Sequence, residues 1–161
     1  MANKFSLTKG KSIFIIDLIL IPICILLVYS GLKLHKAGHG IDHDIWEYWA
    51  NYHVVVSIVS LILVWWHVKA HWNWYKGLMQ KGLKGKSKTT VFISVLFFIL
   101  TMTGILLIFF IDGANSSIGL WHYKLGLITT FLIVIHIVKR FPMMVKGLKL
   151  KKKSRNSNAI M

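Results

Sequence analysis

Two pairs of histidines, each pair fourteen residues apart, are the residues of this sequence best suited to chemistry. His53 and His67 close the stretch HVVVSIVSLILVWWH, and His122 and His136 close HYKLGLITTFLIVIH. An imidazole is costly to place in an apolar segment unless its nitrogens have partners. Neutral imidazole is also a frequent ligand of haem iron and of other metal ions. Four such residues in matching positions therefore indicate a metal or cofactor site more than a packing role.

The spacing places both histidines of a pair on one face of a helix. Fourteen residues rise about 21 Å and turn through about 1400°, within about 40° of four full turns. If the helix spans a membrane, one histidine of the pair would then lie near each membrane surface. On the same face, small residues follow the first histidine of each pair: Ser57 and Ser60 in one helix, Gly126 and Thr129 in the other. They leave room for a flat, wide group against the backbone.

Four long apolar runs must position these histidines. They cover residues 13–31, 54–66, 91–111 and 118–138, and 55% of the chain is hydrophobic. Three of them are long enough, at about 1.5 Å per residue, to cross a hydrocarbon core of about 30 Å. The run at 54–66 is shorter, and aromatic residues on both sides extend it into the membrane interface. The sequence predicts an all-α integral membrane protein, a four-helix bundle.

The charges alternate between the two sides of the predicted membrane domain. The chain has 161 residues and a formal net charge of +15. Lysines and arginines gather before the first run, between the second and third, and after the fourth, whereas Asp42, Asp44, Glu47 and Asp112 lie in the other two connections. This positive-inside pattern predicts a multi-pass protein of the bacterial cytoplasmic membrane with both termini cytoplasmic. It accounts for the positive charge without nucleic-acid binding.

Three segments follow from this pattern. Residues 1–12 form a basic cytoplasmic N-terminus, residues 13–141 a four-helix membrane domain, and residues 142–161 a lysine-rich cytoplasmic tail. Basic segments beside a membrane are attracted to anionic lipid, so membrane lipid is an expected partner of the tail.

The two halves of the chain share one pattern. YSGL at residues 29–32 precedes the first histidine pair, and MTGI at residues 102–105 precedes the second. We interpret this as a duplicated helical hairpin whose copies are related by an axis along the membrane normal. His53 would then face His122, and His67 would face His136. Imidazoles opposed across a bundle suit the two axial positions of haem iron, and the single Cys24 excludes a CxxCH attachment. The pattern predicts two b-type haems.

The paired histidines, together with the Ser-Gly and Thr-Gly motifs that close the first and third runs, resemble those of bacterial flavinylation-associated cytochromes. These four-helix di-haem proteins are similar in pattern to the di-haem core of quinol-oxidising cytochrome b. The resemblance covers residues 13–140 and implies that His53, His67, His122 and His136 ligate two haems b. It also implies an electron-transfer component of a respiratory oxidoreductase system. Its partners would be membrane quinone and an extracytoplasmic redox protein, with flavin-bearing proteins among the candidates.

His71 is an alternative to His67 as the second ligand of its helix. Its counterpart in the second repeat is Arg140, at the same distance from the first histidine. Arginine stays protonated and cannot ligate iron, which favours His67. His71 and Arg140 could instead contact haem propionates or a quinone head group, or anchor the helices at the interface.

Two other functions stay open from the sequence. One is a haem-bearing membrane anchor subunit of a dehydrogenase or reductase. The other is a histidine-based metal transporter, although about 21 Å between the histidines of each helix exceeds one coordination sphere.

Four further residues of the sequence could take part in chemistry. His35, His39 and His43 recur every fourth residue in the expected loop between the first and second spans, where solvated side chains, a weak metal site or a partner contact are the alternatives. Asp17 lies within the first run, and we expect it to pair with a lysine or to serve proton uptake linked to quinone.

Overall fold

The computed structural model describes residues 2–40, 42–83, 88–110 and 116–157, and within these ranges side chains are described from residue 12 to residue 142. Lys84, Lys86 and Asp112, which contribute to the charge pattern, lie outside the described residues. The described residues form helices and short connections, with no strand among them.

Five helices follow one another along the described parts of the chain: α1 (Ala2–Gly38), α2 (His43–Ala70), α3 (Trp72–Lys81), α4 (Lys88–Phe109) and α5 (Ser117–Ser157). All but α3 contain a segment long and apolar enough to cross a membrane, namely Ser12–Gly38, His43–Ala70, Lys88–Phe109 and Ser117–Pro142. The prediction of an all-helical chain with four apolar helices of spanning length is confirmed.

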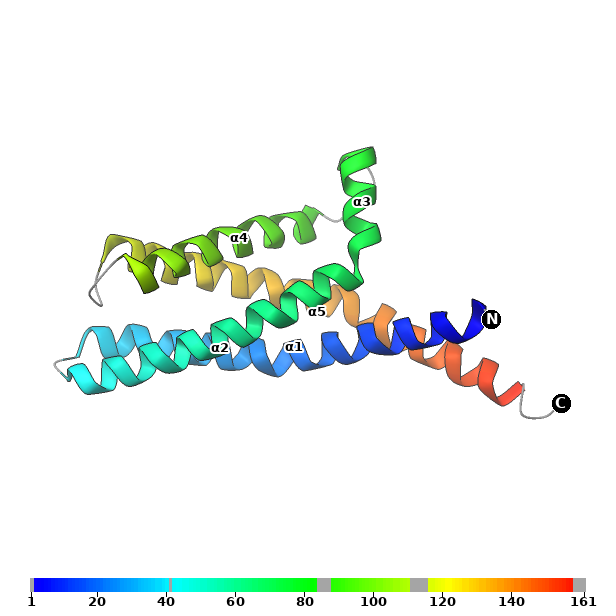
Figure 1. Ribbon diagram of the computed structural model, residues 1–161, viewed down its shortest axis with the longest axis horizontal. Coiled ribbons are helices and arrows are strands. Elements are labelled where there is room, and N and C mark those ends of the chain that lie inside the picture. The colour runs from blue at the N-terminus through cyan, green and yellow to red at the C-terminus, as the bar shows by residue number, and fades with distance from the viewer. Residues whose placement is uncertain (1, 41, 84–87, 111–115, 158–161) are drawn as a thin grey trace.

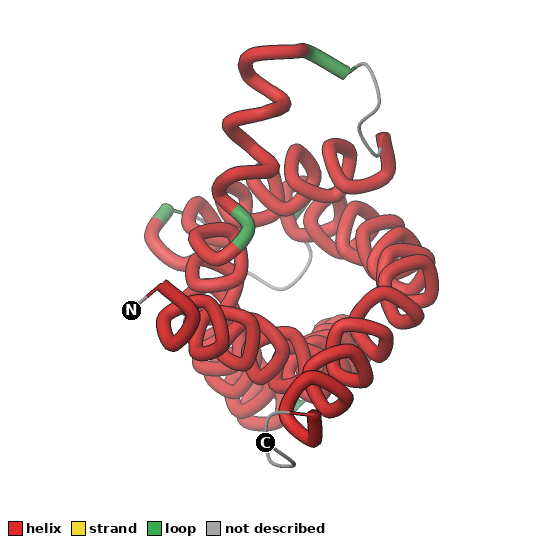
Figure 2. Tube along the Cα trace, turned by 90° about the vertical axis from the view of Figure 1, so that its right-hand side faces the viewer, coloured by secondary structure: helices red, strands yellow, loops and turns green. Residues whose placement is uncertain are grey.

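The four long helices lie side by side around a common axis (Figures 1 and 2). α1 packs along α2, α4 packs along α5, and α1 also touches α5. α1 and α4 end, and α2 and α5 begin, at one end of the bundle, which we call the loop end (Figure 1). Both chain termini lie toward the opposite end, the terminal end (Figure 1).

The bundle turns its large apolar side chains outward. Ile25, Phe98 and Phe131 are each more than 60% exposed, as suits contact with lipid tails. Among the described residues, Val56 and Leu96 are the buried hydrophobic side chains. The buried polar ones are small: Ser30, Ser60 and Thr129. Most of the buried side chains among the described residues are therefore small.

Helix α3 was not predicted from the sequence, which suggested only a basic connection there. It begins at Trp72, after the single cap residue His71 that follows α2, and lies across the bundle axis at the terminal end (Figure 1). The Ser94 hydroxyl donates to the Thr90 carbonyl at 2.9 Å, so it accepts the hydrogen bond of 2.9 Å from the Tyr75 hydroxyl. This bond ties α3 to the beginning of α4.

Two helices are longer than the apolar runs suggested. α1 continues to Gly38, so His35 lies on a helix and not in the expected loop; His39 follows in the turn and His43 begins α2. α5 continues through Pro142 to Ser157, so the backbone of most of the lysine-rich segment is helical.

Candidate functional site

The histidine pair at the loop end comes together as the sequence predicts. The ring centroids of His53 on α2 and His122 on α5 lie 6.4 Å apart, with the ring planes at 88°. With a metal–imidazole bond of about 2.0–2.1 Å and a ring nitrogen about 1.1 Å from its centroid, two imidazoles on opposite sides of one metal ion would have centroids about 6.3 Å apart. The observed separation of the ring centroids is the size expected if His53 and His122 both bound one metal ion.

The local hydrogen bonds fix which nitrogen of His53 carries the proton. Its Nδ1 lies 2.8 Å from Oγ of the fully buried Ser30 on α1. The Ser30 hydroxyl has one proton and donates it to the Leu27 carbonyl at 2.9 Å, so toward His53 it accepts. Nδ1 therefore bears the hydrogen, and Nε2 of the neutral ring keeps the lone pair that a metal needs.

The same arrangement recurs at His122. Its Nδ1 lies 2.8 Å from Oγ1 of Thr103 on α4. The Thr103 hydroxyl points its proton at the carbonyls of Ile99 and Leu100, at 3.0 and 3.1 Å, and so accepts from Nδ1–H. Both histidines at the loop end are held in the tautomer suited to coordination through Nε2.

The glycines that follow Ser30 and Thr103 lie beside the rings of His53 and His122. A Cβ built at Gly31 would lie 3.3 Å from Cε1 of His53, and one at Gly104 would lie 3.5 Å from Cε1 of His122. In each motif the hydroxyl contacts an imidazole; the close approach of the His53 ring favours glycine at Gly31, whereas a Cβ at Gly104 would make only an ordinary van der Waals contact. The sequence revealed the motifs but not these contacts.

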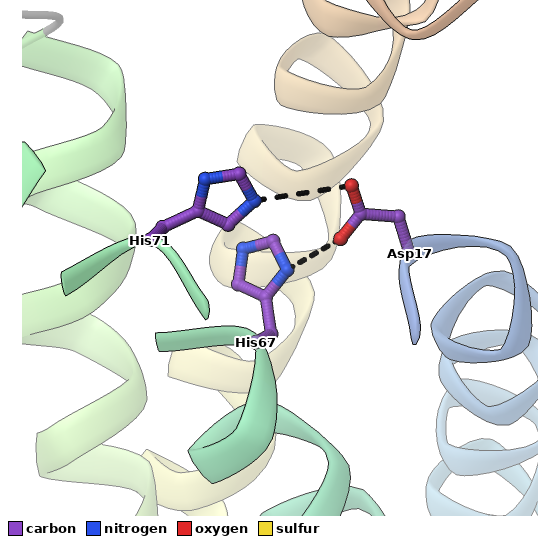
Figure 3. A group of neighbouring side chains, drawn as sticks. All are labelled: Asp17, His67 and His71. Carbon is purple, nitrogen blue, oxygen red and sulfur yellow. Dashed lines mark hydrogen bonds and ion pairs between the residues drawn. The ribbon is translucent and has the colours of Figure 1, made fainter. Parts of the chain in front are cut away.

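At the terminal end, Asp17 on α1 holds His67. The Nδ1 of His67 lies 2.7 Å from Oδ1 of Asp17, and Nε2 of His71 lies 3.9 Å from Oδ2 (Figure 3). The side chains of Asp17 and His67 are 24% and 29% exposed. A carboxylate accepts, so Nδ1 of His67 donates. Among the described side chains Asp17 pairs with histidine; the side chains of Lys4, Lys9 and Lys11, with which a pairing was expected, lie outside the described residues.

The second histidine at the terminal end, His136, is held less closely. Nδ1 of His136 lies 3.5 Å from Oγ1 of Thr90 on α4. Among the described residues, the ring of His67 neighbours that of His71, with 4.7 Å between centroids, and no ring contact joins His67 to His136. The structure thus brings the loop-end pair ring to ring but does not do so for the terminal-end pair.

His71 and Arg140 differ in their backbone setting. His71 is the C-cap of α2, with φ −98° and ψ 17°, so it has left the helical register that carries His53 and His67. Arg140 remains within α5 and is partly buried. The two residues are equivalent by sequence position but not by local structure.

The small residues that follow the loop-end histidines on α2 and α5 are buried or partly buried. Ser60 and Thr129 are buried, and Ser57 and Gly126 are partly buried. The hydroxyls of Ser57 and Thr129 donate to carbonyls of their own helices, at 2.7 Å in each case. A Cβ built at Gly126 would meet nothing within 4 Å. This face therefore offers open space beside Gly126 and hydroxyls satisfied within their own helices.

One group of side chains in the described part of the chain could hold a metal ion directly. Asp17, His67 and His71 each offer a ligand atom, and these atoms lie within 4.8 Å of one another. His35, His39 and His43 form no such group there. His35 instead stacks on Tyr123 at 3.8 Å and touches the edge of His39.

Comparison with protein-family models, curated proteins and solved structures finds no match to this chain. Its function must be inferred from its own residues.

Proposed function

We propose that this protein is a di-haem b-type cytochrome that carries electrons across the bacterial cytoplasmic membrane. His53 and His122 would hold one haem at the loop end, and His67 and His136 would hold the other at the terminal end. The observation that carries the proposal is the loop-end pair: rings 6.4 Å apart, each with Nδ1–H held by a hydroxyl. A haem at each position would supply a one-electron iron couple within a low-dielectric bundle.

The protein's own residues supply the geometry. Each histidine contacts a polar side chain on the other helix of its hairpin, which fixes the ring as outer-shell partners fix metal-ligating histidines elsewhere. The partners are Ser30, Asp17, Thr103 and Thr90. Ser57, Ser60, Gly126 and Thr129 would give a flat macrocycle its clearance.

Matching positions in the two hairpins support their origin by duplication. Asp17 and Ser30 lie 73 residues before Thr90 and Thr103, and the two histidines of α2 lie 69 residues before those of α5. Ser30 contacts His53 as Thr103 contacts His122, and Asp17 contacts His67 as Thr90 contacts His136. We therefore include the two-hairpin repeat in the proposal.

The structure favours His67 over His71 as the terminal-end ligand. His67 keeps the helical register of α2 and has Nδ1 bound to a carboxylate, whereas His71 lies at the junction with α3. His71 and Arg140 remain available for haem propionates or a quinone head group.

The proposed orientation and partners follow from the charges and the resemblance to flavinylation-associated cytochromes. Both termini would be cytoplasmic because the basic residues gather at the terminal end. Membrane quinone would exchange electrons there, and an extracytoplasmic redox protein, with flavin-bearing proteins among the candidates, would do so at the loop end. No residues for substrate chemistry stand out, so the chain is proposed as an electron-transfer component.

The reduced-minus-oxidised spectrum of the purified protein, with a haem assay, tests this function. We expect b-type bands and two haems per chain. His53→Ala, His122→Ala, His67→Ala and His136→Ala should each remove about one haem, and His71→Ala should remove none. A wild-type protein without haem would overturn the proposal, and loss of haem in His71→Ala would overturn the choice of His67.

A histidine-based metal transporter is the second candidate, because Asp17, His67 and His71 offer three ligand atoms within 4.8 Å. It predicts that the haem-free purified protein binds zinc, and that Asp17→Ala and His71→Ala each weaken this binding. A haem-bearing anchor subunit differs from the main proposal in its partner, and stable co-purification with a dehydrogenase subunit would indicate it.

A further inference from the structure

The two ends of the bundle hold their histidines with different chemistry. At the loop end both acceptors are neutral hydroxyls, from Ser30 and Thr103, at 2.8 Å. At the terminal end His67 is held by the carboxylate of Asp17 at 2.7 Å. The other four acidic residues lie at positions 42–47 and 112 of the sequence. Among the acidic residues that the structure describes, Asp17 is the one hydrogen-bonded to a candidate ligand.

A carboxylate and a hydroxyl act differently on an imidazole that binds a metal. Hydrogen bonding from Nδ1–H to a carboxylate raises the basicity of the ligand, and charge-assisted hydrogen bonds are stronger than neutral ones. A more basic ligand, with a negative charge beside it, stabilises the more positive oxidation state of the metal. A neutral hydroxyl gives little of this effect.

The geometry around Asp17 suits this role better than direct coordination of a cation. The 2.7 Å between His67 Nδ1 and Asp17 Oδ1 is the length of a charge-assisted hydrogen bond. The second oxygen, Oδ2, lies 3.9 Å from His71 Nε2, so His71 adds a polar neighbour at the outer side of the carboxylate (Figure 3). Asp17 is three-quarters shielded from solvent, which limits the screening of its charge.

We propose that Asp17 is a positioning residue that orients His67 through Nδ1 and makes the reduction potential at the terminal end lower than that at the loop end. This rests on the proposed di-haem function. Only an electron would move along the bundle, with no bond made or broken: one equivalent leaves the terminal end and one arrives at the loop end. The asymmetry set by Asp17 makes transfer from the terminal end to the loop end the downhill direction.

Arg140 acts against this asymmetry. Its guanidinium lies on α5 one turn beyond His136, and a positive charge there favours the reduced state. Arg140 is on the helix of the opposite ligand, however, whereas the Asp17 carboxylate is bonded directly to the ring of His67. We therefore expect the carboxylate to have the larger effect.

Equilibrium redox titration of the purified haem-loaded protein, followed at the α-band, tests the proposal. The wild type should titrate as two components. Asp17→Asn should raise the potential of the lower component and leave the higher one unchanged. Asp44→Asn, which removes an exposed carboxylate at the loop end, is the matched charge control and should move neither. His67→Ala should remove the lower component.

Each outcome separates this proposal from the di-haem function. A wild-type protein without haem overturns the function itself. Two haems in the wild type, with no upward shift in Asp17→Asn, overturn only the role of Asp17, as does loss of the higher component in His67→Ala. If Asp17→Asn loses one haem, Asp17→Glu decides: recovery of that haem at low potential supports the carboxylate role, and failure to recover it overturns the role.

Discussion

At the scale of single residues, the position of the proton on each histidine ring decides whether Nε2 is free to bind a metal. The hydroxyls of Ser30 and Thr103 each donate their proton to a backbone carbonyl, at 2.9 and 3.0 Å, and each oxygen also contacts a histidine. A hydroxyl used in this way accepts from Nδ1–H, which favours the tautomer whose Nε2 carries no hydrogen. The carbonyl that accepts the hydroxyl proton lies three or four residues earlier on the same helix, and it thus influences the tautomer of a histidine on the next helix.

Loss of one such hydroxyl should loosen one haem. Thr103→Val removes the acceptor of His122 Nδ1–H, and loss of an outer-shell partner typically lowers metal affinity about 10–100-fold. We expect faster haem loss from the loop end to an excess of a haem-scavenging protein, with the terminal-end haem retained. Thr101→Val is the matched control, because Thr101 donates to the Phe97 carbonyl on the same helix and has no histidine contact. Equal haem loss from both variants would contradict the role of Thr103.

Gly126 gives a residue-scale test for a flat group on the inner face of α5. A Cβ at this position meets nothing within 4 Å, and alanine in a helix interior is favoured over glycine by about 0.5–1 kcal/mol. Gly126→Ala should therefore leave the helical far-ultraviolet circular dichroism of the haem-free protein unchanged and still reduce haem content. Leu127→Ala, at a 42% exposed position on the outer surface, should leave haem content unchanged. Full haem occupancy in Gly126→Ala would place the macrocycle elsewhere.

At the scale of elements, the sequence predicted the features that belong to one helix at a time. Four apolar runs and a fourteen-residue spacing were enough to place His53, His67, His122 and His136 on two helices. Helix α3 was missed because its ten residues mix tryptophan, lysine and glycine and contain no long apolar run. The full length of α1 was missed because Gly38 and Gly40 suggested a loop around His35.

The partners of the histidines were missed for a different reason. Which residue of α1 meets which residue of α2 depends on the relative rotation of two helices, and periodicity within one helix does not contain it. A signal was present nevertheless: Asp17 and Ser30 are thirteen residues apart, as are Thr90 and Thr103. Two polar residues at this spacing on the first helix of each hairpin match two histidines fourteen apart on the second.

The attachment of α3 to α4 predicts a measurable coupling between Tyr75 and Ser94. Their hydroxyls lie 2.9 Å apart, and a hydrogen bond of this kind contributes about 0.5–1.5 kcal/mol. In a double-mutant cycle of Tyr75→Phe and Ser94→Ala, thermal unfolding in detergent should show a coupling free energy of that size. Haem content should stay at two per chain in all three variants. Additive effects of the two substitutions would mean that the bond contributes nothing.

At the scale of the whole molecule, the bundle has two unlike ends, and most of the side chains buried between them are small. The large apolar residues that would fill the core of a soluble bundle point outward, and Ser30, Ser60 and Thr129 are buried instead. Such an interior is stabilised if a large apolar group occupies it. Most basic residues of the sequence precede the first apolar run, follow the second or follow the fourth, which are the segments at the terminal end, and Asp17 is bonded to His67 at that end as well. Charge distribution and ligand chemistry thus distinguish the same two ends.

The orientation of these ends in the membrane is the last prediction. Native Cys24 can be replaced by serine, after which a single cysteine is introduced at an exposed position of either end: His39→Cys in the turn after α1, or Gln80→Cys on α3. Because basic connections stay in the cytoplasm, a membrane-impermeant maleimide should label His39→Cys in cells whose outer envelope is opened but whose cytoplasmic membrane is intact. Gln80→Cys should react only after that membrane is disrupted. The reverse labelling pattern would place the loop end in the cytoplasm, and the lower potential expected beside Asp17 would then direct electrons inward.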